Sequence, residues 1–210
     1  MPWMYAVSAL CLFVCLPFFM HYKRILRYPL AASFKALGTL CAASMALTAA
    51  LRLDQYCWIC FGALLLHSAA DYLMEFNMYL GAGFFLAGHI CYICFFTHLF
   101  PVSGLHLIAL LCLLGIVVFL LWRWRRLVGK QLPFFAIYAV VLSITAACAI
   151  AGLSAHTLQG QMIALGGALF FLSDAMILGR TLFTATHAVD WVIMITYYSA
   201  QLLIAASCLV

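Results

Sequence analysis

Apolar segments about as long as a membrane is thick recur along the whole chain. A transmembrane helix needs roughly 20 consecutive apolar residues. Only 7% of the 210 residues are charged, whereas about 25% of an ordinary soluble protein is charged. The first segment is interpreted as a span and not as a cleaved leader, because similar segments follow to the last residue. We therefore predict an all-α, polytopic transmembrane bundle, one domain over residues 1–210, with eight spans near 2–20, 30–51, 56–73, 79–98, 104–122, 132–153, 158–179 and 189–209.

Lysine and arginine are distributed unevenly between the two ends of this predicted bundle. Short connections make sequence neighbours antiparallel, and cationic residues favour the cytoplasmic side. The even-numbered connections hold only Arg52. We predict that the odd-numbered connections are cytoplasmic and that both termini are outside. The net charge of +5 is then a topology signal that favours contact with the lipid bilayer and gives no indication of a nucleic-acid partner. The odd-numbered connections hold eight cationic residues, Lys23, Arg24, Arg27, Arg123, Arg125, Arg126, Lys130 and Arg180.

Few polar side chains fall inside the predicted spans, and such residues are costly in a bilayer and indicate function. Two of them are aspartates, Asp71 in the third span and Asp174 in the seventh. With a rise of 1.5 Å per residue, the two aspartates, Lys35 and Tyr138 lie within roughly 10 Å of the cytoplasmic boundary. We therefore predict a shared polar cavity in the inner half of the bundle. The other polar residues are His89, Tyr197, Tyr198 and Gln201.

Two aspartates in unlike surroundings can divide into a protonated acid and an ionised base at neutral pH. Lys35 is the one cation inside the predicted spans that can hold one of them ionised. Structural interpretations stay open for several positions. Asp71 can be a carboxylate at the membrane interface, Lys35 can extend to the lipid headgroups, and His89 can be satisfied by a backbone carbonyl.

Three other functional classes also remain open. A metal-dependent lipid hydrolase is disfavoured because only His67 and His89 lie well inside the spans. A proton-coupled small-molecule or lipid transporter would use Asp71, Asp174 and Lys35 as a relay. A quinone-linked thiol oxidoreductase would use C-x-x-C pairs, although Cys in apolar helices behaves as a small hydrophobic residue. The two pairs are Cys57–Cys60 and Cys91–Cys94.

Five motifs in order resemble those of the YhhN family of lysoplasmalogenases, which are multi-span membrane proteins. The segment YPLAASFKAL ends at Leu37, SAADYLM contains Asp71, GAGFFLAGHICY ends at Tyr92, and GALFFLSD ends at Asp174. The last motif, TYYSAQ, ends at Gln201. The family usually has proline after the lysine and glycine before the first aspartate, where this chain has alanine.

The resemblance implies a hydrolase that cleaves the vinyl-ether bond of lysoplasmalogens and releases a fatty aldehyde and a glycerophospho-base. It implies Asp71 and Asp174 as catalytic acid and base, in an order that the motifs leave open. We expect a lysophospholipid substrate drawn from the membrane, no metal or other cofactor, and a bacterial cytoplasmic location. The residues expected to bind substrate are Lys35, His89, Tyr92, Tyr138, Ser173, Tyr197, Tyr198 and Gln201.

Overall fold

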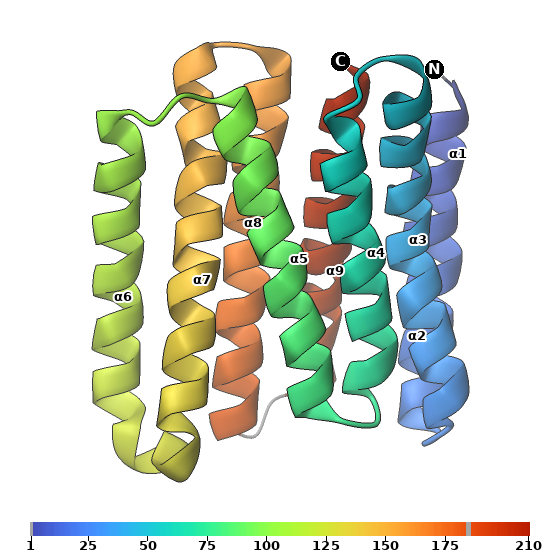
Figure 1. Ribbon diagram of the computed structural model, residues 1–210. Helices are drawn as coiled ribbons and strands as arrows, with labels where there is room; N and C mark the ends of the chain where they lie inside the picture. Colours follow the sequence, from blue (N-terminus) through green and yellow to red (C-terminus); the bar gives the residue numbers. More distant parts are fainter. Residues whose placement is uncertain (1, 184–185) are drawn as a thin grey trace.

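The computed structural model describes residues 2–183 and 186–210, and helices account for nearly all of them (Figure 1). The first rod is continuous and consists of α1 (Pro2–Leu10), the π-helical turn η1 (Cys11–Cys15) and α2 (Leu16–Arg24). The remaining α-helices run antiparallel to their sequence neighbours. They are α3 (Tyr28–Arg52), α4 (Cys57–Met74), α5 (Met78–Leu99), α6 (Gly104–Val128), α7 (Leu132–Ile150), α8 (Leu158–Leu182) and α9 (His187–Ala206).

The predicted all-helical, multi-span membrane architecture is confirmed. Among the described residues, seven helical stretches are long and apolar enough to cross a membrane. The longest, Gly104–Ala155, reverses direction at the 3₁₀ turn η2 (Gly129–Gln131) and so contains two antiparallel helices, α6 and α7 (Figure 1). The eight predicted spans therefore correspond to eight rods, and the two chain ends lie at the same end of the bundle.

Two α-helices end away from the ends of the predicted spans. The fifth span was expected to end near residue 122, but α6 continues through three arginines to Val128. Charged residues end an apolar segment without ending a helix, and α6 stops where Gly129 adopts a positive φ of 59°. The sixth span was expected to continue to residue 153, but α7 ends at Ile150 and a 3₁₀ turn, η3 (Ala151–Ala155), follows. Residues 184 and 185, in the predicted last connection, lie outside the described residues.

Small residues bring the helices close together in the centre of the bundle. Transmembrane helices associate through close packing, which small side chains permit. A Cβ atom at Gly167 of α8 would lie 2.3 Å from the Cβ of Ala149, so this glycine lets α8 approach α7. Helix α3 is buried along an alanine-rich face that includes Ala42, Ala46 and Ala49.

Helix α6 lies at the edge of the bundle and exposes large apolar side chains along most of its length (Figure 1). Leu107, Leu111, Val118 and Phe119 are each about 60% exposed. An exposed apolar surface of this extent is unsuited to water and fits contact with acyl chains. The chain is accordingly an integral, multi-pass membrane protein.

Candidate functional site

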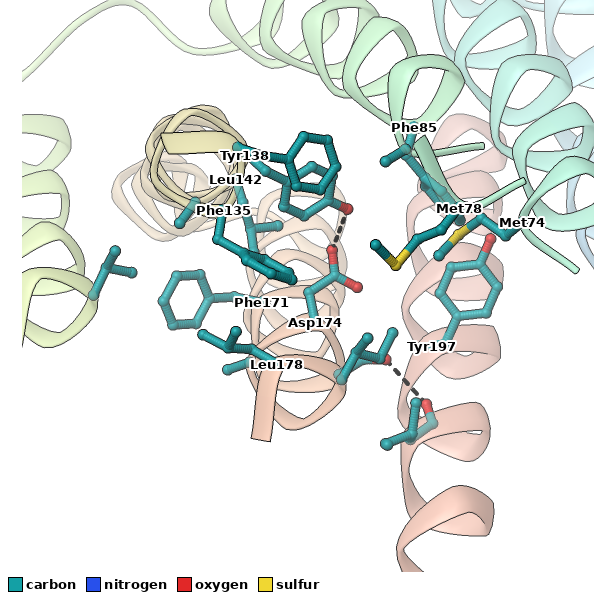
Figure 2. Close-up of a pocket in the computed structure, with 18 of the residues that line it drawn as sticks. Met74, Met78, Phe85, Phe135, Tyr138, Leu142, Phe171, Asp174, Leu178 and Tyr197 are labelled. Atoms are coloured by element: carbon teal, nitrogen blue, oxygen red, sulfur yellow. Dashed lines mark hydrogen bonds between the residues drawn. The ribbon is translucent and has the colours of Figure 1, made fainter. Parts of the chain in front are cut away.

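A cavity of about 110 Å³ lies between α3, α4, α5, α6, α7, α8 and α9. It occupies the half of the bundle nearest the α4–α5 and α6–α7 connections, since its wall includes Met74, Met78 and Phe134. Most of the wall is apolar. Figure 2 shows the Tyr138 and Asp174 side chains pointing toward one another at this cavity, with Tyr197 on another helix. The polar side chains of the wall are Lys35, Asp71, Tyr138, Ser173, Asp174 and Tyr197.

The sequence predicted all six of these polar residues as parts of a site, and the structure brings them together at one cavity. They come from five helices, α3, α4, α7, α8 and α9. Each of these helices would otherwise expose an isolated polar group to lipid, which costs free energy. Gathering the polar groups at one cavity avoids this cost and creates a polar patch on an apolar wall.

The carboxylate of Asp71 is fully buried and has a dense set of partners. The Lys35 ammonium lies 3.3 Å from Oδ1. The Thr39 hydroxyl donates to Oδ2 over 2.5 Å, and the Tyr197 hydroxyl donates to the same oxygen over 2.7 Å. Two hydroxyl donors and an ammonium group are the partners that suit an ionised carboxylate, which only accepts hydrogen bonds. Complete burial and three polar partners disfavour the interpretation of Asp71 as merely a carboxylate at the membrane interface.

A chain of hydrogen bonds connects Asp71 to residues that lie behind the cavity wall. The Tyr92 hydroxyl donates to Oε1 of Gln201 over 2.7 Å, which assigns the orientation of that amide. Nε2 of Gln201 then donates to the Tyr197 hydroxyl over 3.1 Å and to Nδ1 of His67 over 3.1 Å. Because the Tyr197 oxygen accepts from Gln201, its own proton is directed at Asp71. The chain from Tyr92 through Gln201 and Tyr197 therefore ends with a donor at the carboxylate.

Asp174 has a different environment. Its Oδ2 atom accepts a hydrogen bond of 2.6 Å from the Tyr138 hydroxyl and lies 3.9 Å from Nε2 of His89. Among the described residues, no Lys or Arg nitrogen lies within ion-pair distance of this carboxyl group. The two aspartates therefore have the unlike surroundings that an acid and base pair requires.

His89 lies beside the site and not on the cavity wall. Its side chain is 1% exposed, and its ring packs against Tyr138, Phe170 and His67. Neither ring nitrogen has a hydrogen-bond partner among the described residues, so the interpretation that a backbone carbonyl satisfies it was wrong. The neighbouring Gly88 leaves room for His67, because a Cβ atom there would lie 2.4 Å from the His67 ring.

Other predicted site residues connect helices. The Tyr198 hydroxyl donates to the main-chain carbonyl of Lys35 over 2.9 Å, so it points away from the cavity. Gly38 makes space for the Tyr198 ring, which a Cβ atom would approach to 2.6 Å. Ser173 lines the cavity and also donates to the Ile193 carbonyl over 3.1 Å, which joins α8 to α9. Tyr92 and Gln201 lie behind the wall, where they support Tyr197.

The prediction missed Thr39, His67, Glu75 and Lys23, which all belong to the same polar network. Thr39 follows Lys35 by four residues, His67 precedes Asp71 by four, and Glu75 follows it by four. Residues four apart share a helix face. This spacing was the signal in the sequence that pointed to the first three. Lys23 has no such signal, because it lies on α2 and reaches Glu75 only in the folded bundle.

The cavity wall contains no cysteine among the described residues. All ten cysteines are free thiols. Cys57 and Cys60 are buried at the start of α4, at the opposite end of the bundle from Asp71, while Cys94 of the second C-x-x-C pair is exposed on α5. In the described parts of the chain, no three His, Cys, Asp or Glu side chains converge on a point that suits a metal ion.

Comparisons with known proteins agree with the sequence motifs. The YhhN family model matches residues 30–208, which include every residue of the cavity wall. The match begins at the start of α3 and leaves out the first rod, α1 to α2. No curated protein and no solved structure matches the chain.

Proposed function

The chain belongs to the YhhN family, and on that premise we propose that it hydrolyses the vinyl-ether bond of lysoplasmalogens to a fatty aldehyde and a glycerophospho-base. One observation carries the proposal. Two aspartates with different partners, Asp71 and Asp174, share one apolar cavity inside the membrane-spanning bundle. This arrangement suits a reaction that needs a proton donor and a proton acceptor on either side of an apolar substrate.

Asp174 is assigned as the acid. A vinyl ether hydrolyses after a proton is added to the carbon that is not bonded to oxygen, which produces an oxocarbenium ion. Oδ2 of Asp174 accepts from Tyr138, so the proton is assigned to Oδ1. In the described parts of the chain, no Lys or Arg side chain is within ion-pair distance to hold the group ionised. The negative charge that Asp174 gains on donating its proton then stabilises the oxocarbenium ion beside it.

Asp71 is assigned as the base. Lys35, Thr39 and Tyr197 hold it as a carboxylate before the reaction. Water adds to the oxocarbenium carbon and passes a proton to Asp71, which gives a neutral hemiacetal. The hemiacetal hydroxyl then returns its proton to Asp174, Asp71 protonates the departing glycerol oxygen, and the carbon–oxygen bond breaks. Both aspartates end in their starting states, so no outside proton source is needed.

The apolar wall fits the rest of the substrate. Its members include Leu121, Phe134, Phe135 and Phe171, which suit a single hydrocarbon chain. A lysolipid has only one chain and is drawn from the membrane, so we expect it to enter between helices from the cytoplasmic leaflet. The predicted orientation, which follows from the uneven distribution of cationic residues, supports a position of the cavity near that leaflet. A bacterial cytoplasmic membrane fits this orientation.

Hydrolysis in D₂O tests the proposal. Protonation at carbon leaves one deuterium on the carbon next to the aldehyde group, and the glycerol product keeps its original oxygen. Mass spectrometry of the trapped aldehyde should find this deuterium with the wild-type protein. Aldehyde without deuterium at that carbon would contradict acid catalysis at the double bond.

A further inference from the structure

One oxygen atom of Glu75 lies between two ammonium groups at the edge of the site. Its Oε1 atom is 3.0 Å from Nζ of Lys23 and 3.9 Å from Nζ of Lys35. Lys35 also contacts Asp71 at 3.3 Å. The four charges therefore alternate in sign from the cavity outward, in the order Asp71, Lys35, Glu75 and Lys23.

Exposure is least at the inner end of this row of charges and greatest at the outer end. The Asp71 side chain is 0% exposed, Lys35 11%, Glu75 7% and Lys23 31%. Lys23 and Glu75 lie where α2 and α4 end, at the end of the bundle that the cationic residues assign to the cytoplasm. A lipid whose chain occupies the cavity places its headgroup at this depth.

The two ammonium groups have a common support that does not depend on Glu75. The Phe19 ring lies 5.2 Å from Nζ of Lys23 and 5.9 Å from Nζ of Lys35. Cations are attracted to aromatic faces at such distances. The position between the lysines is therefore an anion site that a carboxylate of the protein fills when no other anion is bound.

We propose that this row of charges is a subsite for a zwitterionic headgroup. A phosphate diester takes the place of Glu75 Oε1 between Lys23 and Lys35, and the released Glu75 carboxylate binds the headgroup ammonium. The inference rests on the proposed lysoplasmalogenase function and assigns the residues that recognise the headgroup of its substrate, Lys23, Lys35 and Glu75. Lys23 lies outside the part of the chain that the YhhN family model matches.

The distances along α4 agree with this assignment. Asp71 and Glu75 are one helical turn apart, which is about 6 Å along the axis. In the substrate, a glycerol unit separates the vinyl ether from the phosphate and spans a comparable length. The reacting bond therefore lies beside Asp71 when the phosphate lies beside Glu75.

Charge pairing makes the subsite selective. A zwitterionic headgroup replaces the Lys23–Glu75 ion pair with two new pairs, so every charge keeps a partner. An anionic headgroup without an amine leaves the nearly buried Glu75 carboxylate unpaired. Leaving a charge without its partner in such a place is costly. Phosphoethanolamine is therefore favoured over phosphoglycerol.

The test compares three vinyl-ether lysolipids with the same chain. One carries phosphoethanolamine, one phosphoglycerol, and the third is the alkenylglycerol without phosphate. In the wild type, KM should be lowest for phosphoethanolamine. Glu75→Gln should reduce the preference for phosphoethanolamine over phosphoglycerol by ~10-fold, the effect of losing one ion pair of about 1.4 kcal/mol. Lys23→Gln should raise KM for both phosphate-bearing lipids and leave alkenylglycerol unchanged.

Arg24→Gln is the matched control. Arg24 lies in the same turn of α2, is exposed, and loses the same charge when substituted. Its KM ratios should equal those of the wild type. If Glu75→Gln and Lys23→Gln both release aldehyde with unchanged KM ratios, the Lys23–Glu75 ion pair only links α2 to the end of α4. The subsite would then be overturned while the lysoplasmalogenase proposal stood.

A binding measurement tests the headgroup subsite independently of the proposed lysoplasmalogenase activity. Saturated alkyl-ether lysolipids lack the reactive double bond, so their affinity for purified wild-type protein depends on recognition alone. Calorimetry should show tighter binding of the phosphoethanolamine form than of the phosphoglycerol form. Equal affinity for the two headgroups would overturn the subsite, whether or not the protein releases aldehyde or the Glu75→Gln variant folds.

Discussion

The Tyr197 hydroxyl donates to Oδ2 of Asp71 over 2.7 Å and so joins α9 to α4 across 126 residues of sequence. Because Gln201 donates to the same hydroxyl, the Tyr197 oxygen is already an acceptor and its proton is available to Asp71. A carboxylate that receives such a bond together with Thr39 and Lys35 is prepared to accept a proton late in the reaction and not to donate one first. This relationship is the reason for assigning Asp71 as the base and Asp174 as the acid.

Asp174→Asn should abolish aldehyde release while the protein stays folded. The amide keeps the size of the carboxyl group and the hydrogen bond from Tyr138 but has no acidic proton, and acid catalysis contributes about 10²- to 10⁴-fold to rates. Asp54→Asn is the control, since Asp54 is exposed in the connection at the opposite end of the bundle. Retained turnover in a folded Asp174→Asn protein would remove Asp174 from the mechanism.

Tyr138→Phe should lower kcat by ~10- to 100-fold, because a hydrogen bond to a charged group is worth about 1.5–3 kcal/mol. The lost bond is the 2.6 Å contact that orients Asp174 and stabilises it after proton donation. The effect should appear in kcat more than in KM. Tyr72→Phe, at an exposed position on α4, should change neither constant, and an equal effect of both substitutions would argue against a role for Tyr138.

Two alanine substitutions on α5 should differ in their effects on stability. At Gly88 the new Cβ would lie 2.4 Å from the His67 ring, and overpacking of this kind costs about 1–3 kcal/mol. At Gly83 nothing lies within 4 Å, so alanine should be neutral or stabilise the helix by up to about 1 kcal/mol. Thermal unfolding in detergent should show a lower Tm for Gly88→Ala alone. Equal Tm values would mean that His67 is not packed against α5 at this point.

Orientation in the membrane is tested by labelling from one side. Lys130→Cys, in the α6–α7 turn, should react with a membrane-impermeant maleimide only after the cytoplasmic face is opened. Gln55→Cys, in the α3–α4 connection, should react from outside in intact cells. Both positions are exposed, and the native protein provides the background labelling. The reverse pattern would invert the predicted topology.

The sequence was sufficient to predict the helical architecture and the polar members of the cavity wall. Both predictions depend on the same cost, that of placing polar groups in lipid, which limits where Asp71, Asp174 and Lys35 can face. The helix ends were less predictable, because hydropathy marks the edge of an apolar segment while backbone geometry, as at Gly129, ends the helix.

The hydrogen-bond and ion-pair partners of each side chain could not be predicted from the sequence alone. Tyr197 and Tyr198 are adjacent, yet successive residues of a helix point about 100° apart, so one faces the cavity and the other binds the Lys35 carbonyl. Which of the two faces the cavity depends on the packing of α9 against α3. The contact between Lys23 and Glu75 likewise depends on helices that meet only in the folded bundle.

The measurement that tests the central claim most directly is a hydrolysis assay with purified protein in detergent. It uses a lysoplasmenyl lipid beside its acyl-lyso counterpart and follows free aldehyde and free fatty acid. We expect aldehyde from the vinyl ether, no fatty acid from the acyl lipid, and no product with Asp174→Asn. Fatty acid from the acyl lipid, or no aldehyde from the vinyl ether, would contradict the proposed function.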